Sequence, residues 1–214
     1  MNTKLFPRLQ SIIRTSLKSK LIILLLVSAF TTNIVNAQLA GGFKGGVNFS
    51  SIIITNNQVY LDDANLKTRY GYNLGSFVRN SFSKSFAWQI EFQFASKGFI
   101  AEIDNQNNDV SLNYLNWPLL LVYKATPSFG IEAGLEPGLL ISGEREYKGF
   151  DLGIDIGLSY LIKNKWLVGV RYNQGLPFSF DTEDLPGIDE TPNYQHSVLQ
   201  LYIGFNILQI AAGE

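Results

Sequence analysis

The feature that most constrains this chain is a two-residue alternation of apolar side chains with small, polar or charged ones, repeated along the sequence after residue 37. Successive residues of a β-strand point to opposite faces, so each alternating segment forms a strand with one apolar and one polar face. Eight segments carry the pattern: 43–50, 69–79, 85–97, 111–124, 129–141, 151–160, 166–172 and 199–207. The sequence therefore predicts an all-β fold of eight antiparallel strands.

The segment 111–124 alternates least cleanly, and it contains Pro118. Proline has no backbone N–H to donate to a strand ladder, so within a sheet it marks a bulge or a break. We therefore expect one irregular strand at this point of an otherwise regular sheet.

Residues 1–37 have the pattern of a secretory signal peptide. Five basic residues and no acidic one precede the apolar run at 21–30, and Val35, Asn36 and Ala37 follow as a cleavage site. A membrane-anchoring helix is the alternative, but the apolar run is well short of the ~20 residues that a bilayer span needs. We expect cleavage after Ala37, which leaves a barrel domain at 38–214 in an exported protein.

Composition excludes several classes of function. Residues 38–214 contain 12 Lys and Arg against 18 Asp and Glu, so the exported form lacks the basic excess that nucleic-acid binding needs. The chain has no cysteine and one histidine, His196, which excludes thiol nucleophiles, cysteine-ligated metals and His-rich metal sites. A glycine-rich phosphate loop and a dinucleotide fingerprint are also missing from the sequence. We expect neither a cofactor nor a nucleic-acid partner.

The direction of the apolar face distinguishes a soluble barrel or sandwich, which buries it, from a membrane barrel, which turns it toward lipid. The polar face here is rich in glycine and charged residues, which suits the filled interior of a narrow barrel. The connections also alternate: they are short at 80–84, 125–128 and 163–165, and long at 51–67, 98–109 and 175–194. Short periplasmic turns and long extracellular loops are typical of a transmembrane up-and-down β-barrel in the outer membrane.

Aromatic residues gather near both ends of the predicted strands. Tyrosine and tryptophan favour the two interfaces between a bilayer and water, because their rings are apolar on one side and polar on the other. We predict that seven of them contact outer-membrane lipid at these interfaces: Trp88, Tyr123, Tyr160 and Trp166 on the short-turn side, and Tyr70, Tyr72 and Tyr172 on the long-loop side.

Four stretches resemble the porin-like outer-membrane β-barrel family common in Bacteroidota: GGFKGGVNFS at 41–50, NYLNWPLLLVYK at 113–124, GIEAGLEPGLLIS at 130–142 and VLQLYIGFNIL at 198–208. The resemblance spans essentially all of 38–214 and implies a small barrel in the cell outer membrane. Some similar barrels are accessory proteins of the secretion and gliding machinery. The resemblance thus implies a structural or partner-binding role, with a protein partner at the extracellular loops or the periplasmic turns, and leaves the oligomeric state open.

Charged residues recur on the polar face of the predicted strands. In a narrow lumen such groups pair, because a buried charge without a partner costs about 3 to 5 kcal/mol. Carboxylates at a suitable separation can also catalyse glycoside hydrolysis, which is the alternative to a structural role. We predict a structural ion-pair network in the lumen, made of Lys44, Arg69, Glu91, Lys97, Glu132, Glu136, Asp155 and Arg171.

Two further functions compete with a non-enzymatic barrel. His196 and Ser197 invite comparison with outer-membrane lipid A deacylases, which use a serine and a histidine with an acidic partner. Adjacent strand residues face opposite sides, so these two side chains are poorly placed to share a hydrogen bond. A small-solute pore is disfavoured because eight strands enclose an interior that side chains largely fill. We therefore expect no enzymatic activity and no catalytic residues.

Overall fold

The computed structural model describes residues 38–54, 65–103, 106–143, 149–176 and 194–210. Within these ranges the chain forms nine β-segments: β1 (Gln38–Ile54), β2 (Asn65–Ser81), β3 (Phe86–Ile103), β4 (Gln106–Asn116), β5 (Leu119–Lys124), β6 (Phe129–Ser142), β7 (Phe150–Ile162), β8 (Trp166–Gly175) and β9 (Tyr194–Ile210). The predicted signal peptide and its cleavage site lie outside the described residues. Across the described ranges, no helix is long and apolar enough to cross a membrane.

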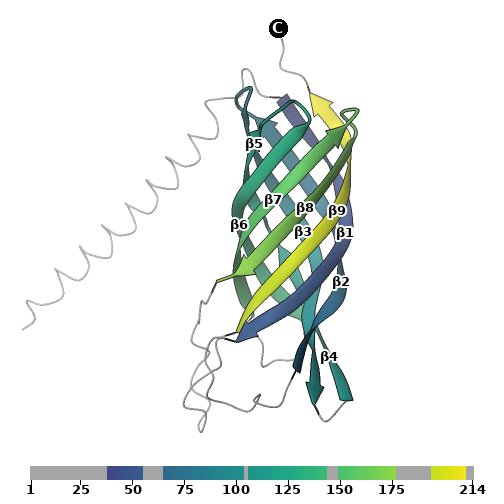
Figure 1. Cartoon of the computed structure of the whole chain (residues 1–214). Coiled ribbons are helices and arrows are strands. Elements are labelled where there is room, and N and C mark those ends of the chain that lie inside the picture. Colours follow the sequence, from purple (N-terminus) through teal and green to yellow (C-terminus); the bar gives the residue numbers. More distant parts are fainter. Residues whose placement is uncertain (1–37, 55–64, 104–105, 144–148, 177–193, 211–214) are drawn as a thin grey trace, which may run out of the picture.

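The segments form one closed antiparallel barrel (Figure 1). Apart from β4 and β5, neighbours in sequence pair with each other, and the barrel closes where β1 pairs with β9, from Leu39 opposite Ile210 to Ile54 opposite Tyr194. Figure 1 shows the strands tilted against the barrel axis, as closure of a sheet requires. The all-β, up-and-down barrel architecture predicted from the alternation is confirmed.

Nine segments occupy eight positions around the barrel. β4 and β5 both lie between β3 and β6, and Trp117 and Pro118 separate them. The ladder continues across this break, because the N–H of Trp117 donates to the carbonyl of Pro137 and the N–H of Glu91 donates to the carbonyl of Pro118. The interruption expected at Pro118 is therefore present, and it accounts for the difference between nine segments and eight predicted strands.

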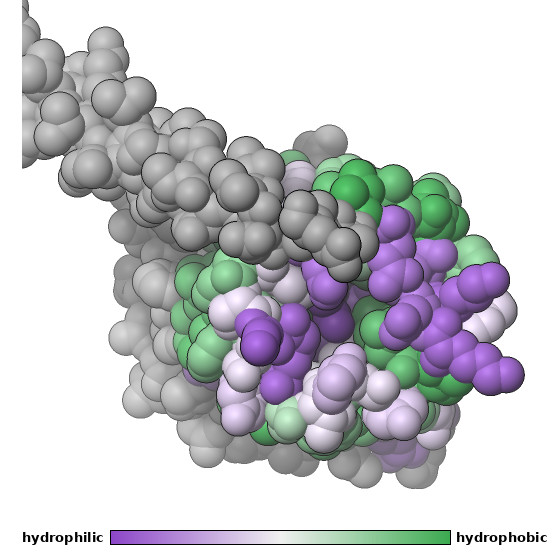
Figure 2. Space-filling view, turned by 90° about the horizontal axis from the view of Figure 1, so that it is seen from above, coloured by the Kyte–Doolittle hydropathy of each residue, from purple (hydrophilic) through white to green (hydrophobic). Residues whose placement is uncertain are grey.

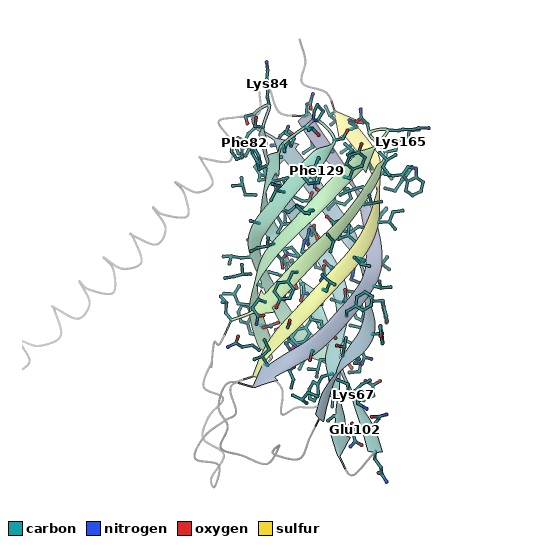
Figure 3. The ribbon with its side chains drawn as sticks, viewed as in Figure 1. Lys67, Phe82, Lys84, Glu102, Phe129 and Lys165 are labelled. Atoms are coloured by element: carbon teal, nitrogen blue, oxygen red, sulfur yellow. The ribbon has the colours of Figure 1, made fainter. Side chains whose placement is uncertain are left out.

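The alternation sorts side chains between the outside and the inside of the barrel. Phe43 is 61% exposed while its neighbour Lys44 is 2% exposed. The same contrast holds between Ile90 and Glu91 on β3. Figure 3 shows side chains projecting from the barrel wall all around it. The apolar face thus points outward, as a lipid-facing surface requires, and the charged face points into the lumen.

Three short turns gather at one end of the barrel, together with the start of β1 and the end of β9 (Figure 1). Two of them use the same chemistry: Ser83 Oγ and Thr126 Oγ1 each accept hydrogen bonds from the backbone N–H groups two and three residues further on. The third turn has positive φ at both Lys163 and Asn164, the geometry of a type I′ hairpin turn. We call this the short-turn end.

The prediction of a long loop at 98–109 is wrong. β3 continues to Ile103 and β4 begins at Gln106, so most of that range is a hairpin that reaches beyond the barrel (Figure 1). Gly98 has a φ of +132°, and the residues 95–99 are all buried, so the two-residue alternation is lost where the strand leaves the barrel. We call the residues 65–68, 98–103 and 106–111 the projecting sheet.

Close packing of the strands depends on particular glycines. A Cβ added to Gly134 of β6 would collide with the backbone carbonyl oxygen of Leu119 on β5. A Cβ on Gly169 of β8 would collide with the ring of Tyr202 inside the lumen. Gly149, at the edge of the β6–β7 connection, would meet nothing within 4 Å. The first two positions therefore require glycine for reasons that do not apply to the third.

Candidate functional site: the polar lumen

Arg171 lies at the centre of the lumen and is completely buried. Its Nη1 and Nη2 donate to the two carboxylate oxygens of Glu91, at 3.1 and 2.8 Å, and Nη2 also donates to Oε2 of Glu132, at 2.7 Å. The planar guanidinium matches a carboxylate in this two-point geometry, which is among the stronger side-chain interactions in proteins. Arg171 therefore ties β8 to β3 and β6 across the barrel.

Further residues complete this central cluster around Glu91 and Glu132. Lys44 Nζ lies 2.6 Å from Glu91 Oε2, and Arg79 Nη2 lies 2.8 Å from Glu132 Oε1. The hydroxyl of Tyr202 donates to Glu132 Oε2 at 3.0 Å, and Lys44 Nζ lies 4.1 Å from the centre of the Tyr202 ring. Asp155 is a third acidic residue beside the three cations, with its Oδ2 3.8 Å from Arg171 Nη1.

A second cluster lies around Lys97, which is 1% exposed. Lys97 Nζ donates to Glu136 Oε1 at 2.8 Å and lies 3.8 Å from Asp151 Oδ2. Asn116 Nδ2 donates to the same Glu136 oxygen at 2.6 Å. Acidic groups outnumber basic ones here, and an amide shares the contact with the carboxylate of Glu136.

The eight charged residues predicted to form one network are divided by the structure into three groups. Lys44, Glu91, Glu132, Asp155 and Arg171 meet in the central cluster, while Lys97 and Glu136 pair in the second. Arg69 belongs to neither: its Nε lies 2.7 Å from Asp109 Oδ1 at the base of the projecting sheet, and its Nη2 donates to Ser111.

Sequence reasoning missed several residues of the lumen. Arg79 and Asp151 share the inward face with the predicted residues, and this parity could have identified both. Tyr202 has the inward parity that the alternation predicts, and Phe77 and Leu167 share the parity of Arg79 and Arg171, but parity does not show that these three pack into an apolar cluster on the face expected to be polar. The lumen is therefore filled by charged pairs and by apolar packing together.

The predicted interface aromatics all lie on the outward face. Tyr70, Tyr72, Tyr123, Tyr160, Trp166 and Tyr172 are exposed, and Trp88 is half-buried. Several pack against another ring on a neighbouring strand: Trp166 against Phe205 at 4.8 Å, Tyr123 against Phe86 at 5.3 Å and Tyr72 against Phe94 at 5.8 Å between ring centres. Their contact with lipid at the two interfaces remains a prediction.

His196 and Ser197 face opposite sides of β9. His196 is buried in the lumen, where its Nε2 lies 3.2 Å from the hydroxyl of Tyr114. The hydroxyl of Ser197 lies 2.9 Å from that of Tyr172, an exposed residue of the outward face. A serine–histidine hydrogen bond is not formed by this pair. Among the described residues there is also no group of three or more His, Asp or Glu side chains that could hold a metal ion.

The closed barrel, its outward apolar face and its filled polar lumen define an outer-membrane β-barrel protein. The sequence profile of the outer membrane protein beta-barrel domain matches residues 36–181, and the chain belongs to this family. It is therefore a protein of the cell outer membrane.

Solved structures similar to this chain include bacterial outer-membrane barrels. Ail of Yersinia pestis, in complex with the heparin analogue sucrose octasulfate, has 16% identity and a TM-score of 0.44 over 80% of this chain and 99% of that one. OprG of Pseudomonas aeruginosa has 14% identity and a TM-score of 0.40 over 80% and 95%. Neisserial surface protein A has 10% identity and a TM-score of 0.45 over 80% and 99%. Curated proteins gave no match.

Proposed function

We propose that this protein is a non-enzymatic outer-membrane barrel with a closed lumen that binds a protein partner outside the cell. The observation that carries the proposal is the projecting sheet, which extends past the barrel at the end opposite the short turns (Figure 1). The earlier resemblance to secretion and gliding accessory barrels supports a protein, rather than a solute, as the partner.

The projecting sheet has its own stabilising contacts. Phe99 and Ala101 of β3 pack with Ile52 of β1 in a buried apolar cluster. Lys67 and Glu102, labelled in Figure 3, form an ion pair at 2.8 Å between β2 and β3. A surface pair of this kind contributes only about 0 to 1 kcal/mol, so the apolar cluster contributes most of the stability of the projecting sheet. The sheet is thus a defined surface.

One edge of the projecting sheet is available for pairing. β4 pairs with β6 only through Asn113–Asn116, so among the described residues no strand covers the outer edge of 106–111. This edge carries the exposed side chains of Gln106, Asn107, Asn108 and Asp109. An edge strand offers unpaired backbone N–H and C=O groups, and extended segments of other proteins add to such edges as a further strand.

Photo-crosslinking on intact cells tests this proposal. A photoreactive residue at Asn108 should give one discrete protein adduct, whereas the same residue at Lys84, at the short-turn end, should not give that adduct. Lysine in place of Gln106, an exposed residue of this edge, should abolish the adduct, because a charge at a sheet edge opposes strand addition. Absence of any adduct at Asn108, or the same adduct from both ends, would contradict a partner at this edge.

The filled lumen also predicts the electrical behaviour of the barrel. Purified protein in planar bilayers is expected to give no stable single-channel steps above the protein-free baseline, because the Arg171 and Lys97 clusters and the Phe77 cluster fill the interior. Reproducible steps of uniform size would show instead that a solute path exists.

A further inference from the structure

A cavity of about 570 Å³ opens at the short-turn end of the barrel. Figure 2 looks onto this end and shows hydrophilic side chains gathered around a hollow. The cavity lies on the far side of the molecule from the projecting sheet, so the function proposed above does not use it. Its size falls within the range of about 300 to 1,000 Å³ that is usual for small-ligand sites. We call it the vestibule.

Arg79 provides a fixed cation in the wall of the vestibule. Its Nε donates to Gln89 Oε1 at 2.6 Å and its Nη2 donates to Glu132 Oε1 at 2.8 Å, which holds the guanidinium plane in one orientation. Its Nη1 has no hydrogen-bond partner among the described residues, and the side chain is 14% exposed. A guanidinium presents five N–H donors in a rigid array, so the Nη1 group remains available to a ligand.

Lys124 adds a second cation to the same wall. Its Nζ donates to the carbonyl of Ser83 at 3.0 Å, and an ammonium carries two further donors. Lys124 and Arg79 lie close enough for their charges to repel each other. Lys84 also lines the vestibule, and no Asp or Glu is among the residues that line it. An anion bound between these cations would relieve the repulsion.

The vestibule also has an apolar part. Phe77 and Leu167 are buried, pack together with Leu161, and line the cavity beside Arg79. A free inorganic ion would leave this apolar surface in contact with water. A ligand that joins an anionic group to an apolar one would use both surfaces at once.

A membrane phospholipid fits the vestibule poorly. Figure 3 shows Lys165 pointing sideways from the short-turn end, away from the barrel wall. An outward lysine of this kind is placed to meet lipid headgroups. Arg79, by contrast, is a largely buried residue of the inward face, and a headgroup would have to leave its leaflet to reach it. The ligand therefore reaches the vestibule from the periplasm.

We propose that the vestibule binds the carboxyl end of a short peptide, with the terminal carboxylate on Arg79 and Lys124 and a final apolar side chain on Phe77 and Leu167. A guanidinium forms charge-assisted hydrogen bonds with a carboxylate, and an apolar last residue fills the rest of the site. The site gives the barrel a second binding function, on the periplasmic side.

Calorimetric titration of the full barrel in lipid nanodiscs tests the proposal with the peptide Gly-Ala-Leu as probe. The peptide with a free carboxylate should bind at least about tenfold more tightly than its C-terminal amide, because the amide has no charge to pair with Arg79 and Lys124. Lys124→Gln should weaken binding by about tenfold, because one charge-assisted contact is lost while that of Arg79 remains. Lys165→Gln removes the same charge from the same end outside the vestibule and should leave binding unchanged. Arg79→Gln should abolish binding while thermal unfolding shows a folded barrel.

Four results would overturn the proposal. They are equal binding of peptide and amide, equal loss in Lys124→Gln and Lys165→Gln, complete competition by inorganic phosphate at the peptide's own concentration, and binding only when the nanodisc contains phosphatidylglycerol. Equal binding of peptide and amide would exclude carboxylate recognition. Equal loss in the two lysine variants would exclude a localised site. Complete competition by phosphate would mean that the site binds any small anion. A requirement for phosphatidylglycerol would mean that the ligand is a lipid and not a peptide.

Discussion

Replacing Arg171 by alanine is expected to lower the free energy of unfolding by about 3 to 5 kcal/mol. The substitution leaves the carboxylates of Glu91 and Glu132 buried and, among the described residues, with one ion-pair partner each, Lys44 for Glu91 and Arg79 for Glu132. Removal of one member of a buried ion pair is costly because the remaining charge keeps its desolvation penalty without the compensating attraction. Urea unfolding of the barrel in lipid vesicles, followed by tryptophan fluorescence, measures the change.

Two further variants distinguish a loss of charge pairing from a loss of packing. Lys165→Ala removes an exposed cation and should change stability by less than about 0.5 kcal/mol. Adding Glu91→Gln and Glu132→Gln to Arg171→Ala removes the unpaired charges and should recover part of the loss, because contacting residues are energetically coupled. An Arg171→Ala barrel as stable as the parent, or no recovery in the triple variant, would show that these ion pairs do not hold the barrel together.

Gly134→Ala is expected to destabilise the barrel by about 1 to 3 kcal/mol or more. The new methyl group would collide with the carbonyl of Leu119, and since that atom belongs to the backbone, β5 and β6 must move apart along their ladder. Gly149→Ala makes the same chemical change where nothing lies within 4 Å, so it should have little effect. The same unfolding assay compares the two, and equal effects would mean that strand packing does not require glycine at 134.

The architecture could be predicted because it depends on local patterns. Parity along each strand placed Glu91 inside and Ile90 outside, and Pro118 marked the break between β4 and β5. The hairpin at 98–103 and 106–111 could not be predicted in this way, because a strand that leaves the barrel no longer has lipid on one side. Phe99 and Ala101 are buried by Ile52 of another strand, a contact that depends on the tertiary structure.

The ion pairs of the lumen were only partly predictable, for a geometric reason. Parity identifies which charges point inward, but the partner across the barrel depends on strand tilt and stagger. Arg171 and Glu91 are 80 residues apart in sequence and meet because β8 and β3 face each other across the lumen. Arg69 has the same parity, which predicts the same network, yet its height on β2 places it against Asp109.

The charged interior also affects how the chain is exported to the outer membrane. Replacement of buried ion pairs by apolar side chains is often neutral or stabilising, so stability alone does not explain Glu91, Glu132 and Arg171. An exported chain must first cross the inner membrane, where an apolar stretch of ~20 residues is retained as a helix. Each charge at the centre of such a stretch opposes that insertion by about 2.5 to 3.5 kcal/mol. The lumen charges thus oppose insertion of the strands into the inner membrane as helices. The chain can then reach the outer membrane, where its apolar face contacts lipid.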